Sequence, residues 1–359
     1  MEAKTDEPER HGGGTPNGFK AFGALESVMV RADGVRVPRG EAEATRRRLL
    51  DLGVLRSDLE VAKDGDAVVF PVVHACGPRL PIVAFEFAER ATRIRSYQEL
   101  LPEPLRGAAP RAYDQLGDLV LVKVPKELAT EAATIGKALL DFHGARAVFS
   151  DGGVKDPFRT RDLTRIAGSG GSETTVQENG VRLVVDPARA YYSPRLAHER
   201  GRVTALVRPG ETVVDLFGGV APFGVQLAKR GAVVHSVDLN PAAVELARRN
   251  ASANGVADKL TLHEGDARVV AGKLPKADRL ILNLPHGAHA FLDVAARLAK
   301  PGATIHYHEI LDPQGVRQRG HDLEAILAKA GWPGKVAATR SVRNYAPDLE
   351  HVVFDLVGA

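Results

Sequence analysis

The sequence predicts an α/β protein in which a parallel sheet in the C-terminal half follows two smaller α+β domains. From about residue 200, apolar strand-like runs alternate with helix-like segments, which is typical of a parallel sheet covered by helices on both faces. The last two strand-like runs, 335–342 and 351–357, are separated by a turn-rich segment too short for a parallel crossover. We therefore expect these two strands to pair antiparallel.

Composition limits the class of protein. The chain has 359 residues, of which 44% are hydrophobic, enough for two or three domains. Its single cysteine, Cys76, rules out an intramolecular disulfide and a Cys-rich zinc cluster. This favours a reducing compartment, and we expect the cytoplasm. No apolar run approaches the roughly 18 residues of a membrane helix. A net charge of +3 allows a polyanionic partner without requiring one.

The N-terminal part predicts a leader and a small domain. Residues 1–24 are polar and rich in glycine, with no apolar signal core, so we expect a flexible leader. Helical spacing over 41–52 and strand-like runs at 66–73 and 82–88 indicate a small α+β domain. We place this domain at 25–100.

A second small domain is expected over 107–180. The segment 96–118 is rich in Pro, Gly and Ala, and we interpret it as a linker. A strand-like run at 118–125, a helical segment at 127–142 and another strand-like run at 145–151 then follow. This order of elements indicates a compact α+β module.

The third and largest domain is expected over 181–359. Just before it, Asn179 and Gly180 stand between two strand-like runs, which is the strongest short signal for a β-hairpin. Within the domain, ligand-binding residues are expected where parallel strands end, because that edge of such a sheet usually carries the chemistry.

The segment VVDLFGGVAPFG, 213–224, predicts a strand, a tight glycine turn and the start of a helix. Glycine allows the backbone to approach a ligand closely and to adopt positive φ. Asp238 ends the second strand, where it can accept hydrogen bonds from both ribose hydroxyls of a nucleoside cofactor. Asp266 ends the third strand and is expected to cap the adenine amino group.

The turn predicts S-adenosylmethionine rather than a dinucleotide. It departs from the GxGxxG pattern of NAD sites, and an acid at its start, Asp215, suits a cationic ligand better than a pyrophosphate. Singly, these residues also fit ordinary strand ends and turns. The ordered trio of acids, followed by Asn283-Leu284-Pro285, argues against that interpretation. The predicted cofactor-binding residues are Asp215, Phe217, Gly218, Gly219, Val220, Ala221, Pro222, Phe223, Asp238, Leu239, Asn240, Asp266, Ala267 and Asn283.

Six segments carry a resemblance to a known family. They read VVDLFGGVAPFG, VDLNPAAVELARRNASANG, GDAR, DRLILNLPHGAHAFLD, FRTRDLTRIAG and YYSPRLAHERGR. Their combination resembles the tRNA (guanine-37-N1)-methyltransferase family of archaea and eukaryotes, over nearly all of the chain from about residue 28. The resemblance implies a class I, Rossmann-like methyltransferase sheet with an antiparallel last strand, and two smaller α+β domains before it.

The resemblance also implies a reaction and a partner. The family transfers a methyl group from S-adenosylmethionine to N1 of the guanosine just 3′ of the tRNA anticodon. Its N-terminal domain touches the outer corner of the tRNA, and its other two domains hold the anticodon arm. A monomer that needs no metal is expected. One departure lies in the turn, where the family commonly has Ala and Gly at the positions of Gly218 and Ala221.

Guanine N1 carries a proton, so the reaction needs a general base and a group that stabilises charge on O6. The resemblance assigns the base to Glu199, which on sequence alone fits an exposed acid near a helix N-terminus. It assigns the O6 contact to Arg159, with Arg161 as the nearby rival. Tyr191 matches a family tyrosine near the reaction site.

Asn283 and Pro285 complete the predicted site. The amide of Asn283 can hydrogen-bond the edge of an extruded purine, and Pro285 keeps the following backbone rigid, although an Asn at a strand end is also a common turn residue. Three arginines are predicted to contact the substrate: Arg161, Arg195 and Arg200. His306 and His308 alternate along one strand, and we expect packing or hydrogen bonding there, not a metal site.

Four alternatives stay open. A wyosine-pathway enzyme uses the same cofactor to transfer an aminocarboxypropyl group to a modified guanosine at the same tRNA position. Its relatives tend to lack the Asn-Leu-Pro sequence found here, so methyl transfer is preferred. A dual-specificity homologue would also methylate carbon 7 of a wyosine intermediate. A non-catalytic tRNA-binding protein and an NAD-dependent enzyme are the alternatives from other classes.

Overall fold

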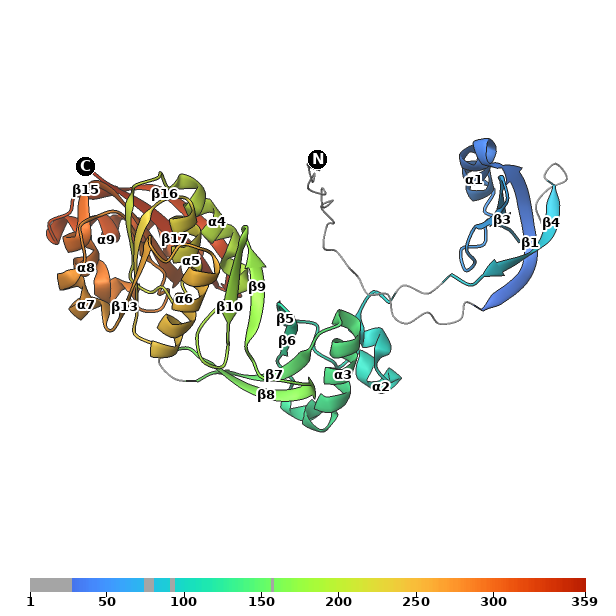
Figure 1. The fold of residues 1–359 in the computed structure, drawn as a ribbon, viewed down its shortest axis with the longest axis horizontal. Helices are drawn as coiled ribbons and strands as arrows, with labels where there is room; N and C mark the ends of the chain where they lie inside the picture. Colours follow the sequence, from blue (N-terminus) through green and yellow to red (C-terminus); the bar gives the residue numbers. More distant parts are fainter. Residues whose placement is uncertain (1–27, 74–80, 91–93, 156–157) are drawn as a thin grey trace, which may run out of the picture. The chain divides into compact units, whose positions relative to one another are not determined.

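The computed structural model divides into two compact units, Met1–Arg95 and Ser96–Ala359 (Figure 1). It describes residues 28–73, 81–90, 94–155 and 158–359. The expected leader and Cys76 lie outside the described residues. None of the described helices is long and apolar enough to cross a membrane.

The first unit is a small α+β module, as expected. Its antiparallel sheet has the order β2-β3-β1-β4, and one helix, α1 (Ala42–Asp51), accompanies it. The strands are β1 (Met29–Pro38), β2 (Ala62–Asp64), β3 (Ala67–Pro71) and β4 (Ile82–Ala88), with a short 3-10 turn η1 (Arg39–Glu41) before the helix. Leu49 of α1 packs with Val35 and Phe70 of the sheet. The opposite face of α1 leaves its arginines exposed to solvent.

The second unit begins earlier than predicted, and the interpretation of 96–118 as a linker is wrong. The segment forms η2 (Tyr97–Leu100), α2 (Glu103–Arg106) and β5 (Tyr113–Leu116). Tyr97 and Leu101 are buried in one apolar cluster with Val120, and the Tyr97 hydroxyl donates to the Pro110 carbonyl. The content of Pro, Gly and Ala carries no information about this burial, because the burial depends on contacts with residues distant in sequence.

The cluster around Tyr97 belongs to a four-stranded sheet of order β5-β6-β7-β8. Its further elements are β6 (Leu119–Val122), η3 (Lys126–Glu131), α3 (Ala132–His143), β7 (Ala147–Val154) and β8 (Arg161–Gly168). The expected strands and helix are present. The strand β8 was not predicted, because it is an edge strand whose residues are charged or at least partly exposed and show no apolar run.

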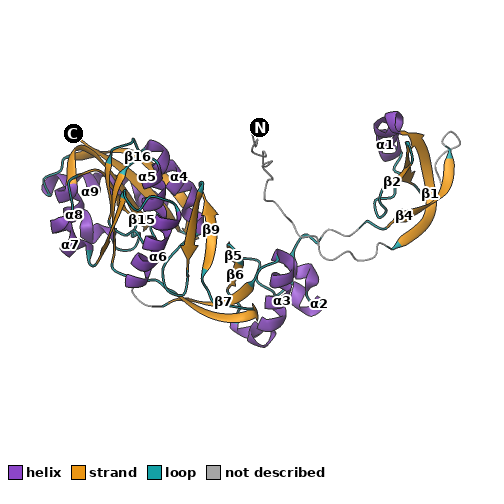
Figure 2. Cartoon of the chain, in the orientation of Figure 1, coloured by secondary structure: helices purple, strands orange, loops and turns teal. Residues whose placement is uncertain are grey.

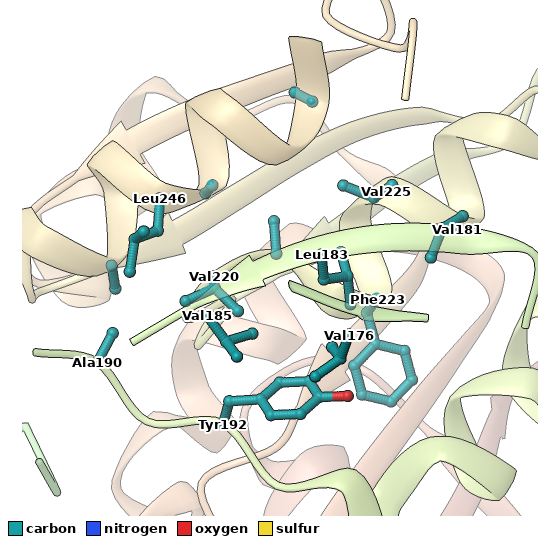
Figure 3. Close-up of a cluster of buried hydrophobic side chains, with 14 of the residues drawn as sticks. Val176, Val181, Leu183, Val185, Ala190, Tyr192, Val220, Phe223, Val225 and Leu246 are labelled. Atoms are coloured by element: carbon teal, nitrogen blue, oxygen red, sulfur yellow. The ribbon is translucent and has the colours of Figure 1, made fainter. Parts of the chain in front are cut away.

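A β-hairpin connects this sheet to the large one. Its strands are β9 (Thr174–Glu178) and β10 (Val181–Val185), and its turn places Asn179 at φ 47° and Gly180 at φ 79°. The hairpin prediction is confirmed. Figure 3 shows Val176, Leu183 and Val185 of the hairpin against Val220 and Phe223. A domain border at residue 180 would divide this hairpin, so the three-domain division stays a prediction.

The large sheet has the order β13-β12-β11-β14-β15-β17-β16. The first five strands are parallel, whereas β17 pairs antiparallel with both β15 and β16. The predicted fold class is therefore confirmed. The strands are β11 (Thr212–Asp215), β12 (Val233–Asp238), β13 (Leu260–Glu264), β14 (Ala277–Leu282), β15 (Ala299–Leu311), β16 (Gly334–Ala346) and β17 (Leu349–Gly358).

Helices cover both faces of this sheet, and each face has its own apolar cluster (Figure 2). One cluster contains residues of α4, α5 and α6, and the other contains residues of α8 and α9. The elements between the strands are η4 (Pro194–Leu196), α4 (Ala197–Leu206), α5 (Pro222–Lys229), α6 (Pro241–Ala253), α7 (Ala267–Val270), η5 (Ala271–Lys273), η6 (Ala288–Phe291), α8 (Leu292–Leu298), η7 (Pro313–Gly315) and α9 (Val316–Lys329).

The turn between β11 and α5 contains the two positions, Gly218 and Ala221, that depart from the pattern of the similar family. Ala221, at the N-terminus of α5, has φ 59°, a left-handed conformation that favours glycine. A Cβ at Gly218 would lie 1.8 Å from the Ser236 hydroxyl oxygen, so an alanine there requires that side chain to move. The chain thus has an alanine, Ala221, where the backbone conformation favours glycine. It has a glycine, Gly218, where a Cβ would clash with a neighbouring side chain.

We expect Ala221→Gly to raise the free energy of unfolding by up to about 1 kcal/mol, because it removes the left-handed penalty on Cβ but adds chain entropy. The matched control is Ala247→Gly. Ala247 is another buried alanine, in the middle of α6, so this change also removes a buried methyl group and should cost about 1 kcal/mol or more. Denaturant titration of both variants measures the difference. Equal destabilisation by the two changes would show that Ala221 is not strained.

Candidate functional site

A cavity of about 240 Å³ lies at the carboxyl ends of the parallel strands. This is the edge where open α/β sheets bind ligands. Its volume is about eight times the roughly 30 Å³ share of a water molecule, so it admits a small organic ligand. Its walls come from the β11–α5 turn, the ends of β12, β13 and β14, a segment near residue 159, and the β16–β17 hairpin.

One end of the cavity carries two carboxylates. Asp238 accepts backbone N–H groups from Gly219 at 2.6 Å and Asn240 at 2.8 Å, which fixes its orientation. Asp266 caps α7 and pairs with Arg268, whose hydrogen bond is the main cause that lowers the pKa of Asp266 to about 2. Burial raises the pKa of Asp238.

Aromatic rings line the same end. Phe217 and Phe291 meet edge to face with centroids 4.8 Å apart, and the Arg268 guanidinium lies 5.3 Å from the Phe291 centroid. Sequence reasoning predicted Phe217 but missed Arg268 and Phe291. Arg268 follows a predicted residue by two positions, whereas Phe291 carried no local signal because its place depends on the packing of η6.

Asp215 lies behind this surface. It is 1% exposed and does not line the cavity, and its Oδ2 has no hydrogen-bond partner among the described residues. Burial raises the pKa of Asp215 to about 7, and the nearby charge of Asp238 adds to the increase. A buried carboxylate with an unfilled acceptor suits a ligand that brings positive charge or a donor.

The predicted cofactor residues divide into two groups. The group that lines the cavity is Phe217, Gly219, Asp238, Leu239, Asn240, Asp266, Ala267 and Asn283. The group that lies outside the lining is Asp215, Gly218, Val220, Ala221, Pro222 and Phe223. The members of the second group shape the turn and its support instead of presenting side chains to the cavity.

The other end of the cavity brings together residues from distant segments. Arg159, at φ 59°, places its guanidinium 5.5 Å from the ring centroid of Tyr191. Asn283 and Pro285 line the same cavity, and the Asn283 Oδ1 is buried without a partner among the described residues. These four residues were predicted to share one site, and the structure places them together.

Glu199 occupies a different position from the one expected of an accessible base. It is 4% exposed, lies on α4 and is absent from the cavity lining. The Arg202 guanidinium donates to both of its carboxylate oxygens, at 2.6 and 2.8 Å. Arg202 also donates to Asp355 on β17, at 2.7 and 3.0 Å.

The predicted contact of Arg200 with the substrate stays a prediction, and the guanidinium is not accessible for it in this structure. Arg200 is 2% exposed, and its guanidinium binds the Glu178 carboxylate and the Ser193 carbonyl. If the Arg200 guanidinium turned to a phosphate, it would lose these hydrogen bonds and leave the buried Glu178 carboxylate without its cation.

Arg161 and Arg195 differ from Arg200, because both remain at least partly exposed. They share Asp114 as a partner, and Arg161 also binds Asp151.

His306 and His308 are hydrogen-bonded, as expected. His306 contacts Asp355 at 2.5 Å and Arg279 at 2.8 Å, and the His308 Nδ1 lies 3.1 Å from the Nε2 of His351. Both side chains of the strand are fully buried. Within the described parts of the chain, no group of three or more His, Cys, Asp or Glu side chains is arranged to hold a metal ion.

Sequence reasoning missed the contribution of the last two strands to the cavity. Arg343 and Tyr345 of β16 and His351 of β17 line it, together with His286. The His286 ring is 3.2 Å from the Tyr345 hydroxyl. No local motif marks these residues, because their position follows from the strand order β15-β17-β16.

Comparisons with known proteins identify the family of the chain. Residues 174–326 match the TRM5/TYW2 methyltransferase domain, 95–171 match the TYW2 N-terminal domain, and 34–78 match the tRNA methyltransferase 5 N-terminal domain. A tRNA (guanine(37)-N(1))-methyltransferase Trm5b of Pyrococcus abyssi is 36% identical over 332 residues, covering 89% of this chain and 97% of that protein.

Two further likenesses bear on the substrate. A solved complex of aTrm5 with tRNALeu has a TM-score of 0.77 at 27% identity and covers 90% of this chain and 99% of that chain. A tRNA(Phe) (4-demethylwyosine(37)-C(7)) aminocarboxypropyltransferase of Pyrococcus horikoshii is 28% identical and covers 71% of this chain and 92% of that protein.

The match to the Pyrococcus abyssi Trm5b has a higher identity and covers more of this chain than the match to the aminocarboxypropyltransferase. The chain therefore belongs to the tRNA (guanine(37)-N(1))-methyltransferase family, whose members are class I enzymes that use S-adenosylmethionine.

Proposed function

We propose that this protein methylates N1 of guanosine 37 in tRNA. One observation carries the proposal: Arg159, Tyr191 and Asn283, from three separate segments, line the same cavity as the carboxylates expected to hold the nucleoside. When bound, S-adenosylmethionine would supply a methyl group carried on a sulfonium. The neutral thioether left behind is a good leaving group and needs no acid. The residues of the chain must therefore position the guanine, remove its N1 proton and stabilise O6.

Asp238, Asp266 and Asn240 are the residues that would hold the nucleoside part of the cofactor. Arg159, which lines the same cavity, would donate to O6 of the guanine. The side chain of Asn283 offers a buried carbonyl oxygen that has no partner among the described residues, and this oxygen suits an N–H on the edge of the base.

Glu199 is proposed as the general base, and Arg202 must release it first. A carboxylate in a two-point contact with a guanidinium is a poor proton acceptor. Asp355 already binds the same guanidinium, so Arg202 keeps one carboxylate partner when Glu199 turns away. This arrangement supports a base that becomes available only when the substrate is in place.

The tRNA is expected to contact both units. Arg46, Arg47 and Arg48 of α1 are exposed, and the first two pair with the exposed Glu43, a partner that phosphates can replace. We propose that this unit touches the outer corner of the tRNA and the second unit its anticodon arm. A monomeric enzyme in the cytoplasm is part of the same proposal.

A second candidate reaction is aminocarboxypropyl transfer to a wyosine precursor. It is favoured by the match of 95–171 to the TYW2 N-terminal domain. Both reactions use the same cofactor, and mapping of the product nucleoside distinguishes them.

The direct test incubates the purified protein with methyl-labelled S-adenosylmethionine and tRNA transcripts that carry G or A at position 37. We expect label only on the G37 transcript, recovered as N1-methylguanosine. Label on the A37 transcript would contradict the proposed specificity. Transfer of an aminocarboxypropyl group to a wyosine-precursor tRNA would favour the second candidate.

Glu199→Gln should lower the single-turnover rate about a hundredfold or more, because general-base catalysis typically contributes 10² to 10⁴. Affinity for the cofactor should stay within about threefold, since Glu199 does not line the cavity. Glu245→Gln, on the exposed face of α6, breaks a surface ion pair and is the matched control. Full activity of the Glu199 variant would remove it from the mechanism.

Asp215→Asn should stabilise the free protein at about pH 8 but not at about pH 4. The folded pKa of Asp215, about 7, lies above its unfolded value, so the folded state binds more protons between the two values. Wild-type stability therefore falls as the pH rises through this window, and the amide removes that loss. Melting curves across the range measure it. The same variant should bind S-adenosylmethionine more weakly, whereas equal stability at all pH values would show that Asp215 is not strained.

A further inference from the structure

Unpartnered polar atoms gather at one end of the cavity. Among the described residues, Asn283 Oδ1, Arg343 Nε and His351 Nδ1 are buried without hydrogen-bond partners, and all three residues line the cavity. His308 Nε2 is also unpartnered, directly behind His351. Native proteins leave few such groups unfilled, so their convergence indicates a polar ligand. The proposed reaction assigns Asn283 but not the two histidines or Arg343.

The two histidines form one unit across neighbouring strands. His308 lies on β15 and His351 on β17, both essentially inaccessible to solvent, and the His308 Nδ1 is 3.1 Å from the His351 Nε2. One of these nitrogens must donate and the other accept. The shared proton therefore decides which atom of His351 carries hydrogen toward the cavity.

Two arrangements of the pair are available. If His308 donates, His351 carries its proton on Nδ1, and the unpartnered Nε2 of His308 is a bare lone pair. If His351 donates, the unpartnered Nε2 of His308 must be a buried N–H. Each arrangement leaves one buried N–H without a partner among the described residues, the His351 Nδ1–H in the first and the His308 Nε2–H in the second. His351 lines the cavity and His308 does not, so a ligand in the cavity can accept only the N–H of the first arrangement. The first arrangement is therefore favoured with a ligand present, and it presents an N–H donor of His351 to the cavity.

The electrostatic surroundings agree with a neutral donor beside cations. Burial, aided by the charge of Arg343, lowers the pKa of His351 to about 4. The ring therefore stays neutral near pH 7 and does not act as a base. Arg343 and Arg159 line the same cavity. A neutral N–H in a cavity that also holds guanidinium groups suits an acceptor on which negative charge develops.

We propose that His351 donates its Nδ1–H to the acceptor edge of the target guanine, O6 or N7, and that His308 is the positioning residue that holds the ring and its tautomer. This inference rests on the proposed function, because it names a further contact in the same site. Arg343, beside the ring, adds positive charge on the same side of the base.

The test uses two amides that each imitate one ring nitrogen. In His351→Asn the amide nitrogen can take the place of Nδ1, so the donor remains and the link to His308 is lost. In His351→Gln the amide reaches the place of Nε2, so the link remains and the donor is lost. We expect the Gln variant to lose about ten- to a hundredfold in single-turnover rate on G37 tRNA and the Asn variant to lose clearly less.

The matched control is His263→Gln. His263 and His235 form a similar imidazole pair, 3.2 Å apart, on β13 and β12 outside the cavity lining. This variant should keep the wild-type rate. Melting temperatures and cofactor affinity are measured for all variants, so loss of folding is separated from loss of the contact.

A purely structural role of the pair predicts the reverse order, with Asn worse than Gln, and that order would overturn the inference. Equal rates for wild type and His351→Gln would also overturn it. If the wild type itself fails to methylate G37 tRNA, the proposed function fails instead.

If the inference holds, a transcript with 7-deazaguanosine at position 37 distinguishes the two acceptors. An undiminished effect of His351→Gln on this transcript assigns O6, and a lost effect assigns N7.

Discussion

The hydrogen bonds of the Arg202 guanidinium connect the helix α4 with the last strand of the large sheet. The guanidinium binds Glu199 of α4 and Asp355 of β17 at 2.6–3.0 Å, and Asp355 also accepts from His306 of β15. Burying charges is costly unless every hydrogen-bonding position is filled, and here the carboxylates share donors across three elements. The pKa of Asp355 is accordingly held far below its usual range, by His306 and Arg202 against the effect of burial. The helix before the sheet is thereby joined to the last strand of the chain.

The same last strand, β17, also contributes to the wall of the cavity. Because β17 lies between β15 and β16, its residues on the Asp355 face extend along the sheet to His351, and the paired strand β16 brings Arg343 beside it. This wall of the cavity therefore comes from the part of the domain farthest in sequence from the β11–α5 turn. In the proposed function, β17 contributes to substrate recognition as well as to the sheet.

Local patterns predicted the fold well where periodicity and turn chemistry agree, as in the Asn179-Gly180 hairpin and the parallel strands that lead to Asp238 and Asn283.

Local patterns failed where burial depends on distant partners. Tyr97 and Leu101 looked like parts of a linker because no local pattern shows that they pack on Val120. Arg200 and Arg202 lie on one short helix, yet only the structure shows that both are held by carboxylates. Arg343 and His351 were missed because strand order, not spacing, brings them to the cavity.

The rebuilt turn shows how the family's ligand surface survives a change in its support. Ala221 is fully buried, and its left-handed backbone is held by its N–H donating to Gly218 and by its carbonyl accepting from Val225. Neither Ala221 nor Gly218 lines the cavity, whereas Gly219 does and donates its N–H to Asp238. The exchange of glycine and alanine therefore acts on the conformational energy of the turn. The N–H that orients the Asp238 carboxylate comes from a position that the exchange leaves unchanged.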